Sequence, residues 1–145
     1  DWSSDVCSSD LVNPASTAGI LAFPGICSYD VAKQGVVALS EVLAVDARNA
    51  GVPILASVLC PGVVRTKIGI SERNRPGNVQ GAGFGTQGLT TATEAIDPEE
   101  VAEQVLGAVR DGRFWIMTHP RYVGLAQERA KCMETGAPPP VPSPI

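Results

Sequence analysis

The chain of 145 residues has the length of about one domain, and it is 44% hydrophobic and 18% charged. This composition supplies enough apolar material for a core and excludes an intrinsically disordered chain. The net charge of −4 argues against nucleic acid or an anionic membrane as the partner, because either would need a basic face. No apolar run reaches the roughly 20 residues that cross a bilayer, and no signal-peptide pattern opens the chain. The four cysteines fit no zinc spacing, so we expect a cytoplasmic protein with free thiols and no metal site.

The opening stretch, DWSSDVCSSDL, differs in composition from the residues that follow it. It shows neither the alternation of a strand nor the stripe of a helix. One reading frame of a common sequencing-library adapter encodes it, so we expect residues 1–11 to be non-native; the alternative is a genuine N-terminal segment. We therefore expect the C-terminal part of a single domain over residues 12–134 and an extended, Pro-rich tail over 135–145.

The first predicted elements are the end of a strand at residues 12–15 and a long helix over residues 28–50. Ser28 is the expected N-cap of this helix, and Gly51 is its expected C-terminal stop. Apolar residues spaced by four, three and four positions form the predicted buried face. These residues are Ala32, Val36, Leu39 and Leu43.

Two apolar runs without alternation predict buried parallel strands, over residues 53–60 and residues 114–117. Between them, residues 69–95 are rich in glycine and lack periodicity. A connection of this length predicts a substrate lid or a poorly ordered segment. A third, shorter helix is expected over about residues 122–133.

A second helix is predicted to begin at the sequence Asp97-Pro98-Glu99-Glu100. Asp97 is the expected cap, Pro98 occupies the first turn, and Glu100 completes a pattern that resembles a capping box. Glu99 and Glu100 are favoured there by the helix dipole. The pair Asp111-Gly112 ends the helix, and its predicted buried face comprises Val101, Val105 and Ala108.

The predicted order of elements is strand, helix, strand, loop, helix, strand, helix. Alternation of this kind is typical of an α/β protein with a parallel sheet. Two complete strands and a strand end are too few to cover the faces of these helices. We therefore expect further strands upstream of this chain.

Three residues that can perform proton chemistry lie near the first strand end. Ser16 follows that strand, and Tyr29 and Lys33 lie in the first turns of the predicted helix. Side chains at i and i+4 share a helix face, with Cβ atoms about 5–6 Å apart. An ammonium group beside a phenol favours the phenolate, and α/β folds place their sites at the carboxyl ends of strands. Because a Tyr-x-x-x-Lys pair also arises by chance, the neighbouring motifs decide its meaning.

Three motifs in this order resemble the short-chain dehydrogenase/reductase family over about residues 12–120. Asn13-Pro-Ala-Ser16 resembles its N-x-x-S, Tyr29 and Lys33 match its Y-x-x-x-K, and residues 61–66 match its P-G-x-x-x-T. The resemblance implies a partial Rossmann-like, doubly wound parallel sheet that lacks its first strands and the cofactor-binding half. No Gly-rich turn of the kind with which the family cradles the cofactor's pyrophosphate precedes Ser16 in this chain.

The resemblance also implies a role for each matching residue. Ser16 holds the substrate oxygen, Tyr29 exchanges a proton with it, and Lys33 favours the phenolate and binds the nicotinamide ribose. The implied cofactor-binding residues are Tyr29, Lys33, Pro61, Gly62, Val64 and Thr66. The cofactor is NAD or NADP, because the residue that separates the two would lie upstream.

The expected function is that of an NAD(P)-dependent oxidoreductase, which transfers hydride between nicotinamide and a carbonyl or secondary alcohol. The alternatives are a non-catalytic binding or scaffold protein, and an epimerase or dehydratase of the broader family. The P-G-x-x-x-T segment argues against the epimerase, because it resembles the simple dehydrogenase branch. The expected partner is a small carbonyl or alcohol substrate. The chain as given is expected to be inactive, because it lacks most of the cofactor site.

A homodimer or homotetramer of the full-length protein is implied by the same resemblance, through the helix that bears Tyr29 and Lys33. Val37, Leu39 and Val42 spread apolar surface around that helix, as an interface would require. A broadly buried core helix explains the pattern equally well. Trp115 is expected in the core or at a subunit interface.

Several other residues have two possible roles. His119 is the single histidine, and a surface or packing role is expected for it rather than catalysis. Arg65 could reach a phosphate, but a solvated side chain is the preferred interpretation. The residues between Ser16 and Tyr29 either wall an apolar substrate pocket or pack in the core: Ile20, Leu21, Phe23 and Cys27.

Overall fold

The computed structural model describes residues 10–68 and 94–142. The elements in chain order are strand β1 (Asp10–Pro14), the short 3-10 helix η1 (Thr17–Gly19), helix α1 (Cys27–Ala50), strand β2 (Leu55–Cys60), helix α2 (Pro98–Arg110), strand β3 (Trp115–Met117) and helix α3 (Arg121–Thr135). This order confirms the predicted alternation of strands and helices. Among the described residues, no helix has both the length and the apolar character needed to span a membrane.

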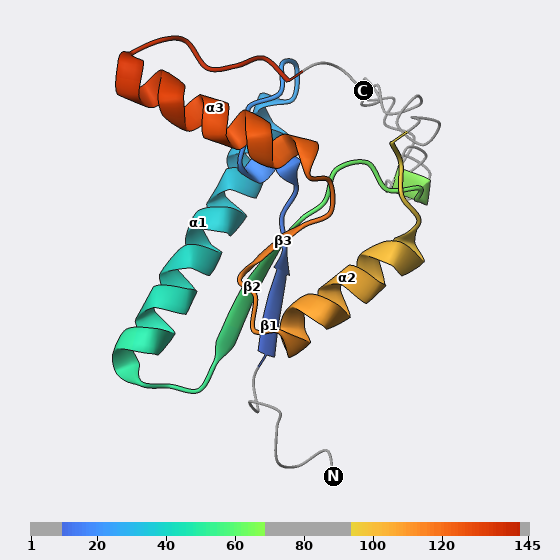
Figure 1. The fold of residues 1–145 in the computed structure, drawn as a ribbon, viewed down its shortest axis with the longest axis vertical. Coiled ribbons are helices and arrows are strands. Elements are labelled where there is room, and N and C mark those ends of the chain that lie inside the picture. Colours follow the sequence, from blue (N-terminus) through green and yellow to red (C-terminus); the bar gives the residue numbers. More distant parts are fainter. Residues whose placement is uncertain (1–9, 69–93, 143–145) are drawn as a thin grey trace, which may run out of the picture.

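The three strands form one parallel sheet in the order β1-β2-β3. Pro14 of β1 lies opposite Leu59 of β2, and Val58 lies opposite Trp115 of β3. Asp10, which falls within the stretch expected to be non-native, is paired with Leu55. Helices α1 and α2 lie on opposite sides of the sheet, and α3 crosses its carboxyl-terminal end (Figure 1). All three strands therefore end beneath α3, where a site is expected in a parallel sheet.

The core forms between α1 and the central strand. Val58 and Cys60 of β2 are fully buried and pack with Ala15 and Val37. Burial raises the pKa of the Cys60 thiol to about 11, against a smaller lowering by a hydrogen bond from the backbone of Ser16. The core thus extends to the end of β1, directly beneath the residues that the motifs single out.

The bounds of α1 confirm its predicted stop and correct its predicted start. Gly51 ends the helix at φ 64°, a left-handed conformation that favours glycine. The helix begins at Cys27, one residue before the prediction, and Ile26 occupies the cap position without a side-chain hydrogen bond. Ser28 is therefore not the N-cap, because it lies inside the first turn.

The predicted buried face of α1 is wrong. Leu39 is 57% exposed and Leu43 is 36% exposed, whereas the buried residues of the helix are Asp30, Val37 and Ser40. Ser40 is buried with its hydroxyl satisfied: Asn13 of β1 donates to it, and it donates to the Val36 carbonyl of the same helix. This helix carries apolar side chains on more than one of its faces, so their spacing alone does not identify the face that packs on the sheet.

Helix α2 confirms its predicted face and corrects its predicted cap. Ala108 is fully buried, with Val101 and Val105 half-buried beside it. Asp97 occupies the cap position, but its carboxylate makes no capping hydrogen bond, because Arg65 binds it instead.

Trp115 of β3, expected in the core or at a subunit interface, is 41% exposed and so does not lie in the core of this chain.

Helix η1 approaches α1 so closely that only glycine fits at the contact. A Cβ atom added at Gly19 would lie 2.6 Å from Cγ2 of Val37 and 2.9 Å from the carbonyl oxygen of Lys33. Both distances are below van der Waals contact, and the second involves backbone that cannot rotate away. The loop after β1 therefore packs directly onto the helical turn that carries Lys33.

We expect Gly19→Ala to lower the free energy of unfolding by about 1–3 kcal/mol, because the added methyl group overpacks this contact. The matched control is Gly35→Ala, in the same helix, where nothing lies within 4 Å of an added Cβ. That change should stabilise the protein by about 0.5–1 kcal/mol through helix propensity. Denaturant unfolding of the complete gene product measures both, and equal effects of the two substitutions would contradict the close contact.

Cys27 and Cys60 differ most in exposure among the described thiols, so they should react very differently with iodoacetamide. Cys27 is exposed and Cys60 is buried, and with a pKa of about 11 only about a thousandth of Cys60 is thiolate at pH 8. Peptide mass mapping at pH 8 should find Cys27 modified in the folded protein and Cys60 modified only in denaturant. Rapid modification of Cys60 in the folded protein would contradict the described core.

The raised pKa of Cys60 also makes stability depend on pH. Because the pKa in the folded state lies above the unfolded value, the contribution of this thiol to the free energy of unfolding is intact below about pH 9 and is lost toward pH 11.

Candidate active site

Ser16 lies two residues beyond the end of β1, where two backbone hydrogen bonds fix the chain against the end of β2. Ala15 donates its N–H to the Leu59 carbonyl, and Thr17 donates its N–H to the Pro61 carbonyl. Ser16 is the cap residue of η1, and its hydroxyl accepts the Ala18 N–H at 3.2 Å. The serine that the motif predicts therefore stands at the carboxyl-terminal edge of the sheet, beside the Pro-Gly turn.

Tyr29 and Lys33 lie one turn apart on α1, as their spacing predicts. The Lys33 ammonium nitrogen is 5.7 Å from the centroid of the Tyr29 ring, a distance within the range of a cation–π contact. The same nitrogen donates to the Pro14 carbonyl at 3.1 Å. Lys33 thus connects the tyrosine turn of α1 to the strand end that precedes Ser16 by two residues. The structure brings these two elements together at one place.

Asp30 is a buried residue of this region that the sequence reasoning missed. Its Oδ2 accepts the Phe23 N–H at 2.8 Å, while Oδ1 has no hydrogen-bond partner among the described residues. Gln34, on the next turn, lies 3.5 Å from the Leu21 carbonyl. Side chains of α1 therefore hold the chain between η1 and the tyrosine. The only available signal was an aspartate directly after the tyrosine of the motif.

The residues expected to wall a substrate pocket divide by their burial. Leu21 is fully buried, so it packs in the core. Ile20 and Phe23 are half-buried, and Cys27 is exposed. The Phe23 ring meets Tyr122 of α3 edge-on, with centroids 6.2 Å apart. Helix α3 therefore covers the same loop that α1 holds from the other side.

The P-G-x-x-x-T segment extends outward from the end of β2. Pro61 lies next to Ser16 through the hydrogen bond from Thr17, and Gly62 contacts the end of β3. Val64 forms a parallel bridge with Ile96. Thr66 is exposed, and its hydroxyl accepts the Ile68 N–H at 3.3 Å. Of the four predicted cofactor-binding residues in this segment, Pro61 and Gly62 lie nearest to Ser16 along the hydrogen-bonded backbone.

Arg65 is exposed to solvent, as expected, and it is also paired. It donates two hydrogen bonds to the Asp97 carboxylate, at 2.6 Å and 3.2 Å, and a further bond to the Ala95 carbonyl. The hydrogen bond from Arg65 lowers the pKa of Asp97, and the same bond raises the pKa of Arg65. The pair joins the segment after β2 to the start of α2.

The predicted substrate lid, residues 69–95, falls almost entirely outside the described residues. Its last two residues are described: Glu94 is exposed and Ala95 is buried. His119 is buried, so the packing role expected for it is the one observed, and the surface role is excluded. Its ring lies between Gly62 and Glu94.

The chain is similar in sequence to short-chain dehydrogenases. The family model described as short chain dehydrogenase matches residues 7–77. The CLA biosynthesis dehydrogenase/reductase of Lactiplantibacillus plantarum is 34% identical over 144 residues, covering 89% of this chain and 49% of that protein. The 3beta-hydroxysteroid dehydrogenase 2 of Eggerthella lenta is 34% identical over 92 residues, covering 63% of this chain and 34% of that protein.

The fold is also similar to solved structures of short-chain dehydrogenases. A short-chain dehydrogenase/reductase from Burkholderia phymatum, in complex with NAD, superposes with a TM-score of 0.79 at 30% identity, covering 96% of this chain and 53% of that one. A short-chain dehydrogenase from Sphingobium yanoikuyae, in complex with NADPH, shares the fold with a TM-score of 0.58 at 21% identity, covering 86% of this chain and 44% of that one. The chain therefore spans about half the length of the first of these relatives. By its motifs, its parallel sheet and these relatives, it belongs to the short-chain dehydrogenase/reductase family.

Proposed function

We propose that the protein is an NAD(P)-dependent oxidoreductase that interconverts a carbonyl compound and a secondary alcohol. The observation that carries this proposal is the position of Lys33. Its ammonium group lies over the Tyr29 ring and binds the strand end that leads into Ser16. An ammonium, a phenol and a hydroxyl at the carboxyl end of a parallel strand are the groups that proton transfer to a carbonyl oxygen requires.

The three side chains would divide the work. The Ser16 hydroxyl would hold the substrate oxygen where negative charge develops, which stabilises the transition state more than the ground state. Tyr29 would donate a proton to that oxygen during reduction and accept it during oxidation. Lys33 would hold a positive charge beside the phenol on the same helix face while the proton moves.

The described residues suit the nicotinamide end of the cofactor. One of the three N–H donors of the Lys33 ammonium binds the Pro14 carbonyl, so the group is fixed in place with donor capacity for ribose hydroxyls. Pro61, Gly62, Val64 and Thr66 would line the nicotinamide side from the end of β2. Bound there, the cofactor supplies or takes up the hydride.

The remaining expectations concern partners and location. The name of the Eggerthella lenta relative, a hydroxysteroid dehydrogenase, is consistent with an alcohol on a carbon skeleton as the substrate class. Leu39 is 57% exposed and Val42 is 55% exposed on α1, which supports a homodimer or homotetramer through this helix. We place the protein in the cytoplasm.

The phenol of Tyr29 can be removed while its ring is kept. We expect Tyr29→Phe in the complete gene product to lower kcat by about 10²–10⁴-fold, because a positioned acid/base contributes this much. The measurement is the change in NAD(P)H absorbance over a panel of ketones, aldehydes and secondary alcohols.

Tyr122→Phe is the matched control, since Tyr122 is the other of the two tyrosines in this chain. Its hydroxyl accepts a hydrogen bond from Arg121, outside the proposed proton path, so its kcat should stay within about threefold of the wild-type value. Equal rates for Tyr29→Phe and the wild type would remove Tyr29 as the proton donor. Cofactor binding without turnover in the wild type would favour the non-catalytic alternative.

A further inference from the structure

His119 lies two residues after the end of β3 and is 7% exposed. Its Nδ1 atom is 3.2 Å from the backbone nitrogen of Gly62, which donates to it, and 2.7 Å from the Thr118 hydroxyl. Its Nε2 atom is 2.9 Å from the carbonyl oxygen of Glu94. One buried ring therefore contacts both the Pro-Gly turn after β2 and the chain that returns toward α2.

The identities of the partners favour one tautomer of this ring. The Gly62 N–H is shared between Nδ1 and the Thr118 hydroxyl, which lies 3.3 Å from the Gly62 nitrogen. A backbone N–H can only donate and a backbone carbonyl can only accept, so these contacts favour the tautomer in which Nδ1 accepts and Nε2 donates to Glu94. A phenyl ring in its place would offer no nitrogen acceptor and would leave the Gly62 N–H with the Thr118 hydroxyl alone.

The contact with Gly62 is too close for any other residue at that position. A Cβ atom there would lie 2.7 Å from Nδ1 and 2.8 Å from Cγ of His119. The glycine of the P-G-x-x-x-T motif thus has a partner 57 residues away in the chain. The motif glycine and the histidine form one structural unit.

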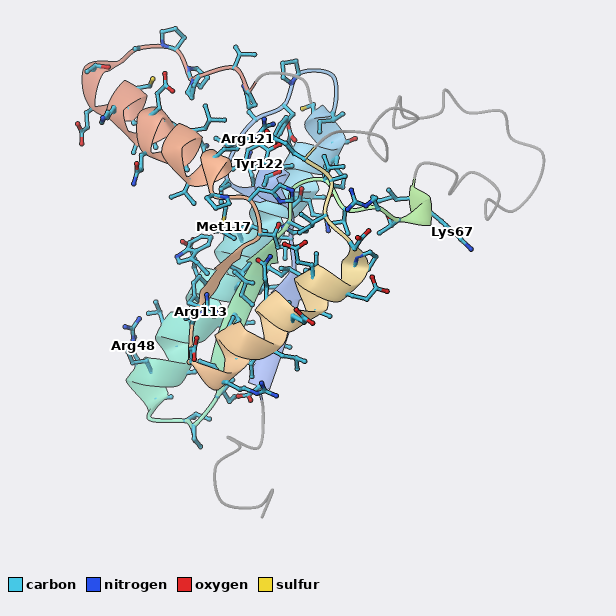
Figure 2. The ribbon with its side chains drawn as sticks, turned by 45° about the vertical axis from the view of Figure 1, so that its right-hand side comes forward. Arg48, Lys67, Arg113, Met117, Arg121 and Tyr122 are labelled. Atoms are coloured by element: carbon cyan, nitrogen blue, oxygen red, sulfur yellow. The ribbon has the colours of Figure 1, made fainter. Side chains whose placement is uncertain are left out.

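The other side of the ring is also held. The Tyr122 ring meets His119 edge-on, with centroids 6.1 Å apart, and Arg121 forms an ion pair with Glu94 at 2.8 Å. Figure 2 shows Arg121 and Tyr122 together at the start of α3, beyond the end of the strand that carries Met117. The histidine therefore cannot move without disturbing the start of α3.

We propose that His119 is a positioning residue for the cofactor, which acts through Gly62. By accepting the Gly62 N–H, it sets the direction in which the backbone of residues 62–66 leaves β2. The inference rests on the proposed function, in which that backbone lines the nicotinamide. Loss of the Nδ1 acceptor should loosen cofactor binding, whereas substrate binding at Ser16 and Tyr29 should change little.

Three substitutions separate the two nitrogens in the complete gene product. His119→Asn keeps an acceptor near the position of Nδ1, His119→Gln keeps a donor near the position of Nε2, and His119→Phe keeps neither. We expect the KM for NAD(P)H to rise about tenfold in the Phe and Gln variants, the effect of losing one buried hydrogen bond. The Asn variant should stay within about threefold of the wild type, and the KM for the carbonyl substrate should be unchanged in all three.

Ser57→Ala is the control for general destabilisation. It removes a buried hydrogen bond between β2 and the chain entering β3, from the Ser57 hydroxyl to the Arg113 carbonyl, at the opposite end of β3. It should lower stability without changing the KM for NAD(P)H. A cofactor KM that is equal in all three His119 variants, whether raised or unchanged, would overturn the proposal.

Hydrogen exchange distinguishes this inference from the proposed function. If the wild type neither binds nor oxidises NAD(P)H, the proposed function fails on that result alone. The amides of residues 62–66 should still exchange at least tenfold faster in His119→Phe than in His119→Asn. Equal exchange rates in the two variants would overturn the positioning role independently of activity.

Discussion

The account depends on the contact between the first turns of α1 and the chain that leaves β1. The Lys33 ammonium binds the Pro14 carbonyl, and the backbone of the same residue lies so close to η1 that only glycine is accommodated at position 19. The ammonium group and the backbone of Lys33 thus together fix the helix relative to the strand end. Because Tyr29 lies one turn before Lys33, this contact also decides where the phenol stands relative to Ser16. Precise placement of such groups matters because small displacements are costly in catalysis.

A second set of contacts joins this unit to the other strands. The hydrogen bond from Thr17 to the Pro61 carbonyl couples the serine loop to the Pro-Gly turn, and His119 couples that turn to the end of β3. Beyond it, the bridge between Val64 and Ile96 leads toward α2. These contacts connect the serine loop, the Pro-Gly turn and the chain that leads into α2 along the carboxyl-terminal edge of the sheet.

Part of this arrangement could be predicted from the sequence. The stop at Gly51, the buried face of α2 around Ala108, and the pairing of Tyr29 with Lys33 follow from local spacing and backbone preference, so they were predictable. The buried face of α1 could not be predicted, because the burial of Ser40 depends on a hydrogen bond from Asn13, which lies 27 residues away in the chain. Asp97 likewise has the sequence of a helix cap, but its carboxylate is taken by Arg65, 32 residues earlier. Local patterns fail where a distant polar partner competes with the local one.

The central claim is that Ser16 and Tyr29 serve one substrate oxygen while Lys33 holds the helix to the strand end. A crystal structure of the complete gene product with NAD(P) and a carbonyl-containing competitive inhibitor tests it most directly. The account predicts the inhibitor oxygen within about 2.6–3.2 Å of both hydroxyl oxygens, with the Lys33 nitrogen still bound to the Pro14 carbonyl. Hydroxyls that face separate parts of the molecule, with the inhibitor oxygen bound to neither, would contradict it.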